Sequence, residues 1–226
     1  MCVPLSSGKE SVTSNPRRLL TRMPYKQVSE RSQLDDLLDE VMLGYVGWAT
    51  DQAEPHVLPV VIGRWGDDVV WHGSTGSGWL RSVAGRRVAV SVSSIEALVV
   101  GRSRLEHSFW YRSAVMYGTP RRLTGGEAAS ALDRLTDHIL PGRLAETRES
   151  RQKELKATAV FAMRLTDWVL KESRDWPDDD DADRASGVWA GVVPLARSFG
   201  KPVAAPDLDP SVAVPESCRR LSQTAH

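Results

Sequence analysis

Residues 69–81 read VVWHGSTGSGWLR and combine the residue types of an anion-binding turn. Three apolar residues lead into His72, and Gly, Ser and Thr residues follow before an apolar helical pattern resumes at Trp79. Glycines allow close approach to the backbone, and the first N–H groups of a helix have no internal partner, so this turn can hold a phosphate. Gly/Ser turns also often serve only as connections. The glycine spacing fits neither a P-loop nor the dinucleotide fingerprint.

Two side chains stand out as candidates for chemistry. His72 ends the predicted strand and titrates near neutral pH, so it can contact a cofactor, bind a substrate carboxylate or ligate haem iron, or simply cap the turn. Arg112 can clamp a phosphate or carboxylate through two hydrogen bonds, or form an ion pair at an interface. His56 follows Pro55 at a strand start, which favours a structural role.

Composition limits the classes of partner. The 226 residues contain 29 Lys plus Arg and 29 Asp plus Glu, a net charge of zero that argues against a general nucleic-acid binder. No apolar run predicts a signal peptide or a membrane span, so we expect a cytoplasmic protein without membrane contact. Cys2 and Cys218 lie in opposite tails, which argues against a disulfide framework and a zinc site. The acidic run 178–181 is expected to be a solvated loop.

An amphipathic helix and a series of strands must position these residues. Ser32 and Asp35 predict a capping box and Gly44 a stop, around apolar residues at helical spacing, namely Leu34, Leu37, Leu38, Val41 and Met42. Short β-branched runs with turn-like spacers predict an antiparallel meander that closes, or nearly closes, into a six-stranded barrel. The predicted strands are 45–50, 56–62, 68–72, 87–93, 97–103 and 113–123, with a short helix at 77–84.

The second half of the chain adds a helix through 128–139, a charged helix through 143–156, and strands at 158–165 and 187–195. We therefore predict three segments: a loose arm at 1–20, one domain at 21–195, and a disordered or extended tail at 196–226, which is rich in Pro, Ala and Ser.

Several segments together resemble the pyridoxamine 5′-phosphate oxidase-like, FMN-binding split-barrel superfamily, within it the branch of the nitroimidazole-resistance proteins. The resemblance covers residues 22–195 and rests on the order and spacing of the series. The matching pieces are Arg22 with Tyr25, LLDEVMLGYVGWAT, PHVLPVVI, VVWHGSTGSGWLRSV, HSFWYRSAVMYGTPRRL and VWAGVVPL. It implies a mainly β fold with flanking helices, a six-stranded antiparallel split barrel, and a homodimer that holds two FMN molecules at its interface.

The resemblance also implies which residues bind the cofactor. The phosphate partners by position are Ser74, Thr75, Ser77 and Arg81. The strand edge beside the isoalloxazine ring is Val57, Leu58, Pro59 and Val60. His107, Ser108, Tyr111, Arg112 and Ser113 would lie near the interface and reach the partner's flavin. Trp189 resembles the family's C-terminal strand, which returns to that interface.

One departure concerns the phosphate turn. Many relatives carry a basic residue where this chain has Gly78 and Trp79, and a charge-assisted hydrogen bond is about twice as strong as a neutral one. Arg81 is positioned to substitute, or Trp79 to stack on a ring.

The sequence therefore predicts an FMN-dependent oxidoreductase that passes electrons from a reduced donor to a small organic acceptor, with a nitroaromatic compound as one candidate. His72 would tune the reactivity of the cofactor or donate a proton, and Arg112 would hold an anionic group. Two alternatives stay open. The first is a non-catalytic store or sensor that binds haem or another planar cofactor in the same groove. The second is a deazaflavin-dependent reductase, whose anionic tail would need arginines such as Arg102, Arg104, Arg121 and Arg122.

Overall fold

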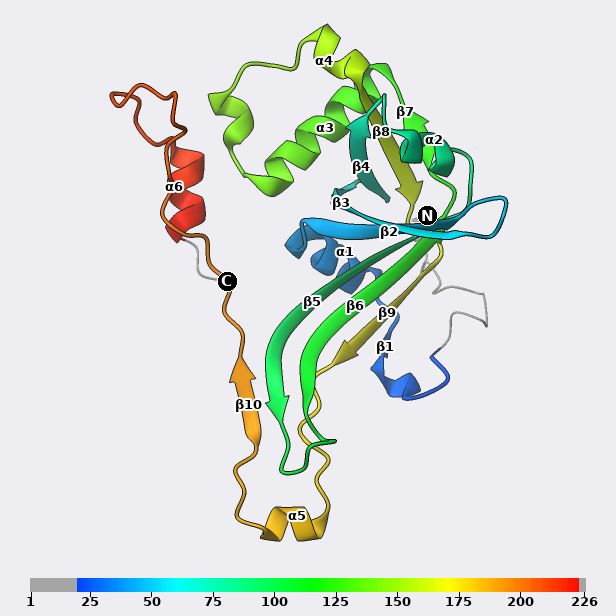
Figure 1. The fold of residues 1–226 in the computed structure, drawn as a ribbon, viewed down its shortest axis with the longest axis vertical. Helices are drawn as coiled ribbons and strands as arrows, with labels where there is room; N and C mark the ends of the chain where they lie inside the picture. The colour runs from blue at the N-terminus through cyan, green and yellow to red at the C-terminus, as the bar shows by residue number, and fades with distance from the viewer. Residues whose placement is uncertain (1–19, 224–226) are drawn as a thin grey trace, which may run out of the picture.

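The computed structural model describes residues 20–223, so the predicted N-terminal arm, apart from Leu20, lies outside the described residues. The described chain is mainly an antiparallel β-sheet with flanking helices (Figure 1). Its strands are β1 (Gln27–Val28), β2 (Leu43–Ala49), β3 (Pro55–Trp65), β4 (Asp68–Ser74), β5 (Val88–Val100), β6 (Ser108–Gly118), β7 (Arg121–Leu123), β8 (Thr158–Arg164), β9 (Trp168–Ser173) and β10 (Gly191–Pro194).

The helices are short, apart from one. They are α1 (Arg31–Glu40), α2 (Gly78–Val83), α3 (Gly125–Ile139), α4 (Gln152–Ala157), α5 (Asp181–Ala185) and α6 (Glu216–Gln223), with 3-10 turns η2 (Pro24–Lys26) and η3 (Arg143–Glu146). None of the helices in residues 20–223 is long and apolar enough to cross a membrane.

The barrel is closed by two bent segments of chain, each of which pairs with two different strands. The strand order is β1-β9-β6-β5-β2-β3-β4-β8-β7, and β10 pairs with β5 outside this path. The segment β6–β7 pairs with β5 at its first part and with β8 at its second, while β8–β9 pairs with β4 first and with β6 afterwards. Counted as one strand each, these two bent segments complete a ring of six strands, which confirms the predicted split barrel.

Two apolar clusters hold the barrel and its helices together. The leucines of α1 pack with barrel residues such as Val46 and Met116, whereas α3 packs on the outside of β4 and β8 through Ala131 and Leu135. In β4, Trp71 points into the first cluster and Val70 into the second. Because β4 is covered on both faces, its sequence is a continuous apolar run that does not alternate with polar residues.

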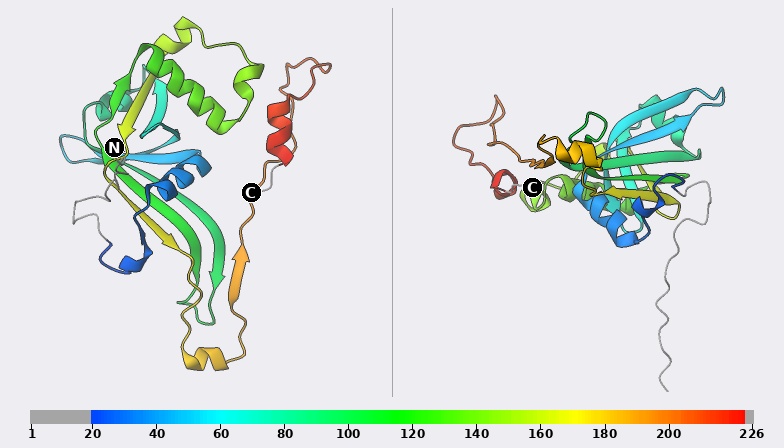
Figure 2. Two further views of the ribbon diagram at one scale, coloured as in Figure 1. Left: turned by 180° about the vertical axis from the view of Figure 1, so that it is seen from behind. Right: turned by 90° about the horizontal axis from the view of Figure 1, so that it is seen from below.

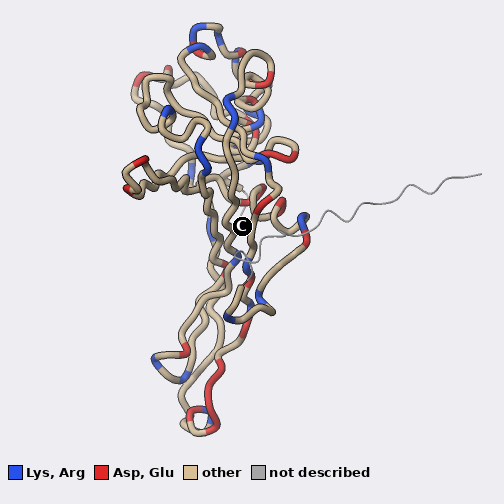
Figure 3. The backbone as a smooth tube through the Cα atoms, turned by 90° about the vertical axis from the view of Figure 1, so that its right-hand side faces the viewer, with Lys and Arg blue, Asp and Glu red and all other residues tan. Residues whose placement is uncertain are grey.

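Beyond the barrel, β5 and β6 continue as a curved hairpin, with α5 near its far end and β10 along β5 (Figures 1 and 2). The acidic run lies in this region, where Figure 3 marks positions of Asp and Glu along the backbone. Asp179 is buried and accepts hydrogen bonds from the backbone N and Nη1 of Arg102, and Asp180 caps α5. Two members of the predicted solvated loop therefore have structural partners. After β10 the chain turns back along one side of the barrel to α6.

The boundaries of α1 differ from the prediction. The helix begins at Arg31 after Glu30, and no side chain caps it, so the predicted Ser32 capping box is wrong. It ends at Glu40, because Val41 is already extended and leads into β2.

Several strand predictions also need correction. Segments 87–93 and 97–103 form one strand, β5, because a register irregularity between Ile95 and Ala97 absorbs Glu96 and lets pairing with β6 continue. Segment 113–123 begins earlier, at Ser108, and is interrupted before β7 at Pro120, which has no N–H to donate. The strand expected at 187–195 is restricted to β10.

The charged helix predicted at 143–156 is wrong as one element. The structure has η3, an extended stretch and α4 there, because the segment lacks regularly spaced apolar residues to hold one helix on the barrel. The prediction also did not include β1, β9 or α6.

Candidate functional site

An opening in the barrel wall lies beside the predicted anion turn. β3 and β4 pair over only four positions, from Ile62 with Trp71 to Trp65 with Asp68, and then separate. β4 continues to Ser74 with β8 alone, and β3 continues with β2 alone. Among residues 20–223, these facing edges of β3 and β4 are not bridged by another strand. Their backbone groups are therefore available to a ligand.

The β3 side of the opening is the predicted segment 57–60. Val57 and Pro59 are exposed on the outer face, whereas Leu58 is half-buried and packs against the barrel core and Val60 is buried in it. A ring beside this edge would thus meet backbone groups and the two outward side chains, while Leu58 and Val60 support the strand from within.

The turn after β4 is held by its own hydrogen bonds. The backbone N of Thr75 donates to Ala157 O at 2.9 Å, and the Thr75 hydroxyl donates to the same oxygen at 3.2 Å. Ser74 Oγ accepts from Gly76 N at 3.2 Å, and Ser77 N donates to Ser74 O at 2.9 Å. The hydroxyl hydrogens of Ser74 and Ser77 can still point to an anion, whereas that of Thr75 is used within the fold.

Arg81 projects from α2 beside this turn. Its Nη2 lies 3.8 Å from the position that a Cβ on Gly78 would take, so the guanidinium lies over this glycine. Arg81 is exposed and forms no ion pair with any residue in the described range. A cation without an ion-pair partner, beside a turn whose Ser74 and Ser77 hydroxyls can still donate, suits an anionic group.

His72 lies at the edge of β4 where the two strands part, opposite Val160 of β8. The side chain reaches the surface in the single chain, yet partial burial lowers the pKa of its imidazole. The neutral form is therefore favoured, and it offers one nitrogen as an acceptor or a metal ligand.

An aromatic stack borders the same opening. Trp48 of β2 lies between His56 and Trp79: its centroid is 5.1 Å from that of His56, with the planes 12° apart, and 6.0 Å from that of Trp79, 30° apart. Trp48 is nearly buried, and its Nε1 has no hydrogen-bond partner in residues 20–223. From the sequence, Trp79 is a candidate for stacking, and a structural role is favoured for His56. Hairpin pairing across residues 50–54 places His56 opposite Trp48 and so brings both to the opening.

The second predicted group, on β6, is separated from the turn within one chain. Two strands, β5 and β2, lie between β6 and β3 in the sheet. Ser108 is exposed at the start of β6, Ser113 is half-buried, and Tyr111 lies 5.5 Å under Lys171 Nζ. Trp189 is 63% exposed and precedes β10. A single chain therefore does not bring these residues to the opening.

Arg112 already has protein partners. Its Nε donates to Glu96 Oε1 at 3.0 Å, and its Nη2 pairs with Glu40, which also accepts from Ser94 Oγ. The ion-pair interpretation of Arg112 thus describes the single chain. The sequence did not identify Glu40 and Glu96, which come from α1 and from the irregularity in β5.

Metal-type donor sets do not occur in residues 20–223: no group of three or more His, Cys, Asp or Glu side chains there could hold an ion. The opening thus offers backbone edges, hydroxyls, an arginine, a neutral histidine and stacked rings. These groups can bind an anionic ligand that carries a flat ring.

Comparisons with known proteins identify the family to which this fold belongs. Residues 30–172 match the family described as pyridoxamine 5′-phosphate oxidase. A Mycobacterium smegmatis structure described as an FAD and haem binding protein is 46% identical over 87% of this chain and 97% of that one, with a TM-score of 0.84. The flavocytochrome Anf3 from Azotobacter vinelandii is 27% identical over 92% and 97%, with a TM-score of 0.84.

A third structure shares the fold. It comes from Bacteroides thetaiotaomicron and carries a provisional description as a 5-nitroimidazole antibiotic resistance protein. It is 16% identical over 64% of this chain and 85% of that one, with a TM-score of 0.56. No curated protein matched the sequence.

Proposed function

Since the chain belongs to the pyridoxamine 5′-phosphate oxidase family, we propose that it is a redox protein that binds a flavin at the opening between β3 and β4. The observation that carries the proposal is Arg81, a cation without an ion-pair partner among the described residues, over Gly78 and beside the hydroxyls of Ser74 and Ser77. The description of a 46% identical protein as FAD and haem binding supports it.

The chain's own residues would divide the task by position. Arg81, Ser74 and Ser77 would hold the phosphate, and the backbone edge of β3 would lie beside the ring. The flavin, when bound, supplies hydride or single-electron transfer. His72 would accept or donate a hydrogen bond at the ring edge, in its neutral form.

The flavin nucleotide is FMN in the prediction from sequence, whereas the similar mycobacterial protein is described with FAD. We propose that the flavin ring lies at the β3 edge with either nucleotide. FMN and FAD would then share the ring site and the phosphate site, and would differ only in the part of FAD that lies beyond the phosphate. Heat release of the bound cofactor and chromatography against both standards identify which one the protein retains.

The direct test is flavin retention after desalting, measured by absorbance in the wild type and in an Arg81→Ala variant. We expect the variant to lose flavin and an Arg122→Ala control, on the exposed strand β7, to keep it. Equal retention in Arg81→Ala would contradict the phosphate site. Reduction by nicotinamide donors followed by reoxidation with a nitroaromatic compound then tests the oxidoreductase half, and bound flavin without turnover would leave a binding protein only.

A homodimer completes the proposal. The outer face of the sheet exposes large apolar side chains, and such a patch on a soluble protein marks an interaction surface. They include Val57, Leu98 and Phe109. Pairing two copies through this face would also allow the β6 residues Tyr111 and Ser113 to approach a partner's flavin. Light scattering at micromolar concentration tests this, and a monomer would contradict it.

Haem is a second candidate, favoured by His72. Burial lowers the pKa of this imidazole and so favours the neutral form, which is the form that ligates iron, and the Trp48 stack offers flat apolar surface nearby. Addition of haemin should give a sharp absorption band that shifts in His72→Ala and is unchanged in His107→Ala. A band that is unchanged in both variants would assign haem to another ligand.

A further inference from the structure

The edge of β5 facing β2 is left open in the middle of the strand. β2 pairs with β5 at Ala89–Ser91, and β10 pairs with it at Ala97–Val100. Between these stretches lie residues 92–96, which contain the register irregularity. A cavity of about 970 Å³ occupies this gap, lined by the ends of α1 and α3, by β2, β5 and β6, and by the C-terminal part of the chain. This volume is that of a site for a cofactor-sized molecule.

The C-terminal strap, which we define as residues 195–223, forms one wall of this cavity. Leu195 and Phe199 line it from the segment after β10, and Leu221 lines it from α6. Leu195 N donates to Glu96 O at 2.8 Å, so the strap starts at the β5 edge. Figures 1 and 2 show the strap running along one side of the barrel to α6.

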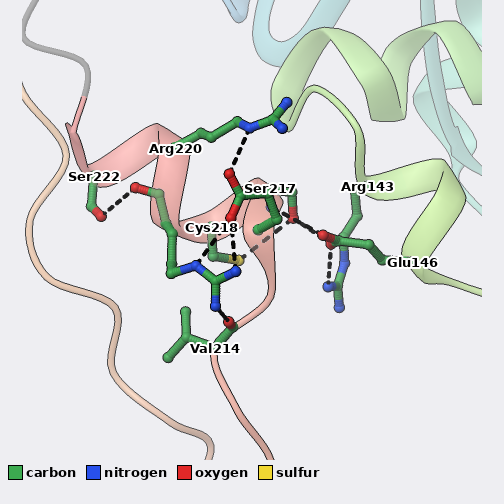
Figure 4. Close-up of polar contacts among 9 residues, drawn as sticks. Arg143, Glu146, Val214, Ser217, Cys218, Arg220 and Ser222 are labelled. Atoms are coloured by element: carbon green, nitrogen blue, oxygen red, sulfur yellow. Dashed lines mark hydrogen bonds and ion pairs between the residues drawn. The ribbon is translucent and has the colours of Figure 1, made fainter.

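The far end of the strap is fastened to η3. Ser217, at the start of α6, donates its backbone N–H and its hydroxyl to the Glu146 carboxylate, at 3.0 and 2.6 Å (Figure 4). Arg143 Nη1 donates to the same carboxylate at 3.1 Å. These contacts hold α6 in place, and with it Leu221, which lines the cavity.

The charged side chains that line the cavity differ in whether they have an ion-pair partner. Asp39 pairs with Arg64 at 2.5 Å and with Arg134 at 3.0 Å, and Glu40 and Glu96 pair with Arg112. Glu96 also pairs with Arg174 at 3.0 Å, so every lining carboxylate has an ion-pair partner. Arg197, on the strap, forms no ion pair within residues 20–223.

The remaining lining determines the class of ligand. Much of it is aliphatic or aromatic, such as Leu43 on one wall and Phe199 on the other. The one histidine of the lining, His138, directs Nε2 to Val41 O at 2.8 Å, so this nitrogen is not available to coordinate iron. An apolar space with one unneutralised arginine at its strap suits an organic anion with an apolar body.

We propose that this cavity is a second ligand site, separate from the β3–β4 opening, which binds an organic anion with an apolar, cofactor-sized body under the C-terminal strap. Arg197 binds the anionic group, Phe199 and Leu221 cover the body, and the Ser217–Glu146 contact keeps the cover in place. The site goes beyond the proposed flavin function and does not depend on it.

The test uses the full-length protein and 8-anilinonaphthalene-1-sulfonate, an aromatic sulfonate, in fluorescence titration and equilibrium dialysis. We expect saturable binding at one site per chain. Arg197→Ala should weaken it about tenfold, or about 1.4 kcal/mol, because the variant loses the charged hydrogen bond to the sulfonate. Arg197→Lys should keep much of the affinity, and Arg184→Ala, on exposed α5, should leave it unchanged.

Phe199→Ala provides a second measurement, because it removes an aromatic side chain that covers the ligand without removing a charge. This variant should also weaken binding of the probe. Flavin content is recorded in the same samples by absorbance. Loss of flavin in Arg81→Ala with unchanged probe binding would show that the two sites are distinct. If no sample contained flavin, the proposed flavin function would fail, while the probe titrations would still test the second site. Unsaturable probe binding, or binding that Arg197→Ala and Phe199→Ala leave unchanged, would overturn the proposal.

Discussion

The indole ring of Trp79 lies on that of Trp48, with the centroids 6.0 Å apart. Trp79 belongs to α2 and Trp48 to β2, so this pair connects the helix that carries Arg81 to the barrel wall. The phosphate turn is consequently positioned by aromatic packing as well as by the hydrogen bonds of residues 74–77.

Removal of this packing should loosen the turn. Trp79→Ala should lower the free energy of unfolding by about 2–4 kcal/mol, because large-to-small changes in packed sites lose burial and leave a cavity. Flavin retention should fall with it. Trp79→Phe, which keeps a ring, should recover much of both in urea unfolding and absorbance measurements. Unchanged stability in Trp79→Ala would show that α2 is held by other contacts.

Gly73 lets α2 lie directly on β4. A Cβ at this position would be 2.9 Å from Leu80 Cδ1, closer than carbon atoms normally approach. Gly73→Ala should therefore cost about 1–3 kcal/mol of stability by overpacking and shift the turn. Gly126→Ala is the matched control, since a Cβ there meets no atom within 4 Å. Equal stability of the two variants in denaturant titrations would argue against close packing at Gly73.

The pH dependence of stability should report on His72. Burial lowers its pKa in the folded protein below the ordinary value of 6.5, so between these two values the unfolded chain binds more protons than the folded chain. Stability should therefore decrease as the pH falls from above 6.5 through the folded pKa. His72→Asn should lose less stability than the wild type over that range, and NMR titration of the imidazole measures the pKa itself. A pKa above 6.5 would contradict this prediction.

Arg112 and Glu96 should be energetically coupled. Arg112 is mostly covered and its Nε lies 3.0 Å from Glu96 Oε1. Each single change removes this contact, while Arg112 keeps Glu40 and Glu96 keeps Arg174 as an ion-pair partner. In a double-mutant cycle of Arg112→Met and Glu96→Gln we expect a coupling energy of about 1–2 kcal/mol, within the range for contacting residues. Additive effects would instead mean that Arg112 is free to serve a ligand.

The attachment of α6 should weaken in acid. Hydrogen bonds from Ser217, then from Arg143, lower the pKa of Glu146 from 4.5 to about 2. A carboxylate with a lowered pKa stabilises the fold fully above its unfolded value and loses this effect as the pH falls toward the folded one. The protection factors of the amides in residues 216–223, which correct for the intrinsic pH dependence of exchange, should fall between about pH 4.5 and 2.

Glu146→Gln should show fast exchange in the same residues already at pH 7, whereas Glu149→Gln, a nearby acidic residue outside this contact, should resemble the wild type. Slow exchange in Glu146→Gln would show that α6 is held by apolar contacts instead.

The parts that the sequence predicted well are those with local signals. The leucines of α1 and the apolar run of β4 identify their elements without knowledge of their neighbours, and the ordered series of motifs identifies the split barrel. The ion-pair partners of Arg112 could not be predicted in this way. Glu40 lies 72 residues away in sequence, and Glu96 lies at an irregularity in β5. Likewise, α6 follows a segment rich in Pro and Ala, and its attachment depends on a single distant carboxylate.

The two bent segments that complete the barrel have a kinetic consequence. β6–β7 and β8–β9 each join two regions of the sheet, and β9 pairs with β6 while β8 pairs with β4, about 90 residues earlier. Contacts so distant in sequence form slowly, because loop closure comes before any gain from pairing. During synthesis, β2 to β6 would therefore emerge with the β4 edge bare, and the ring would close only when residues 158–173 arrive. We expect this exposed intermediate to be the aggregation-prone species on the folding pathway.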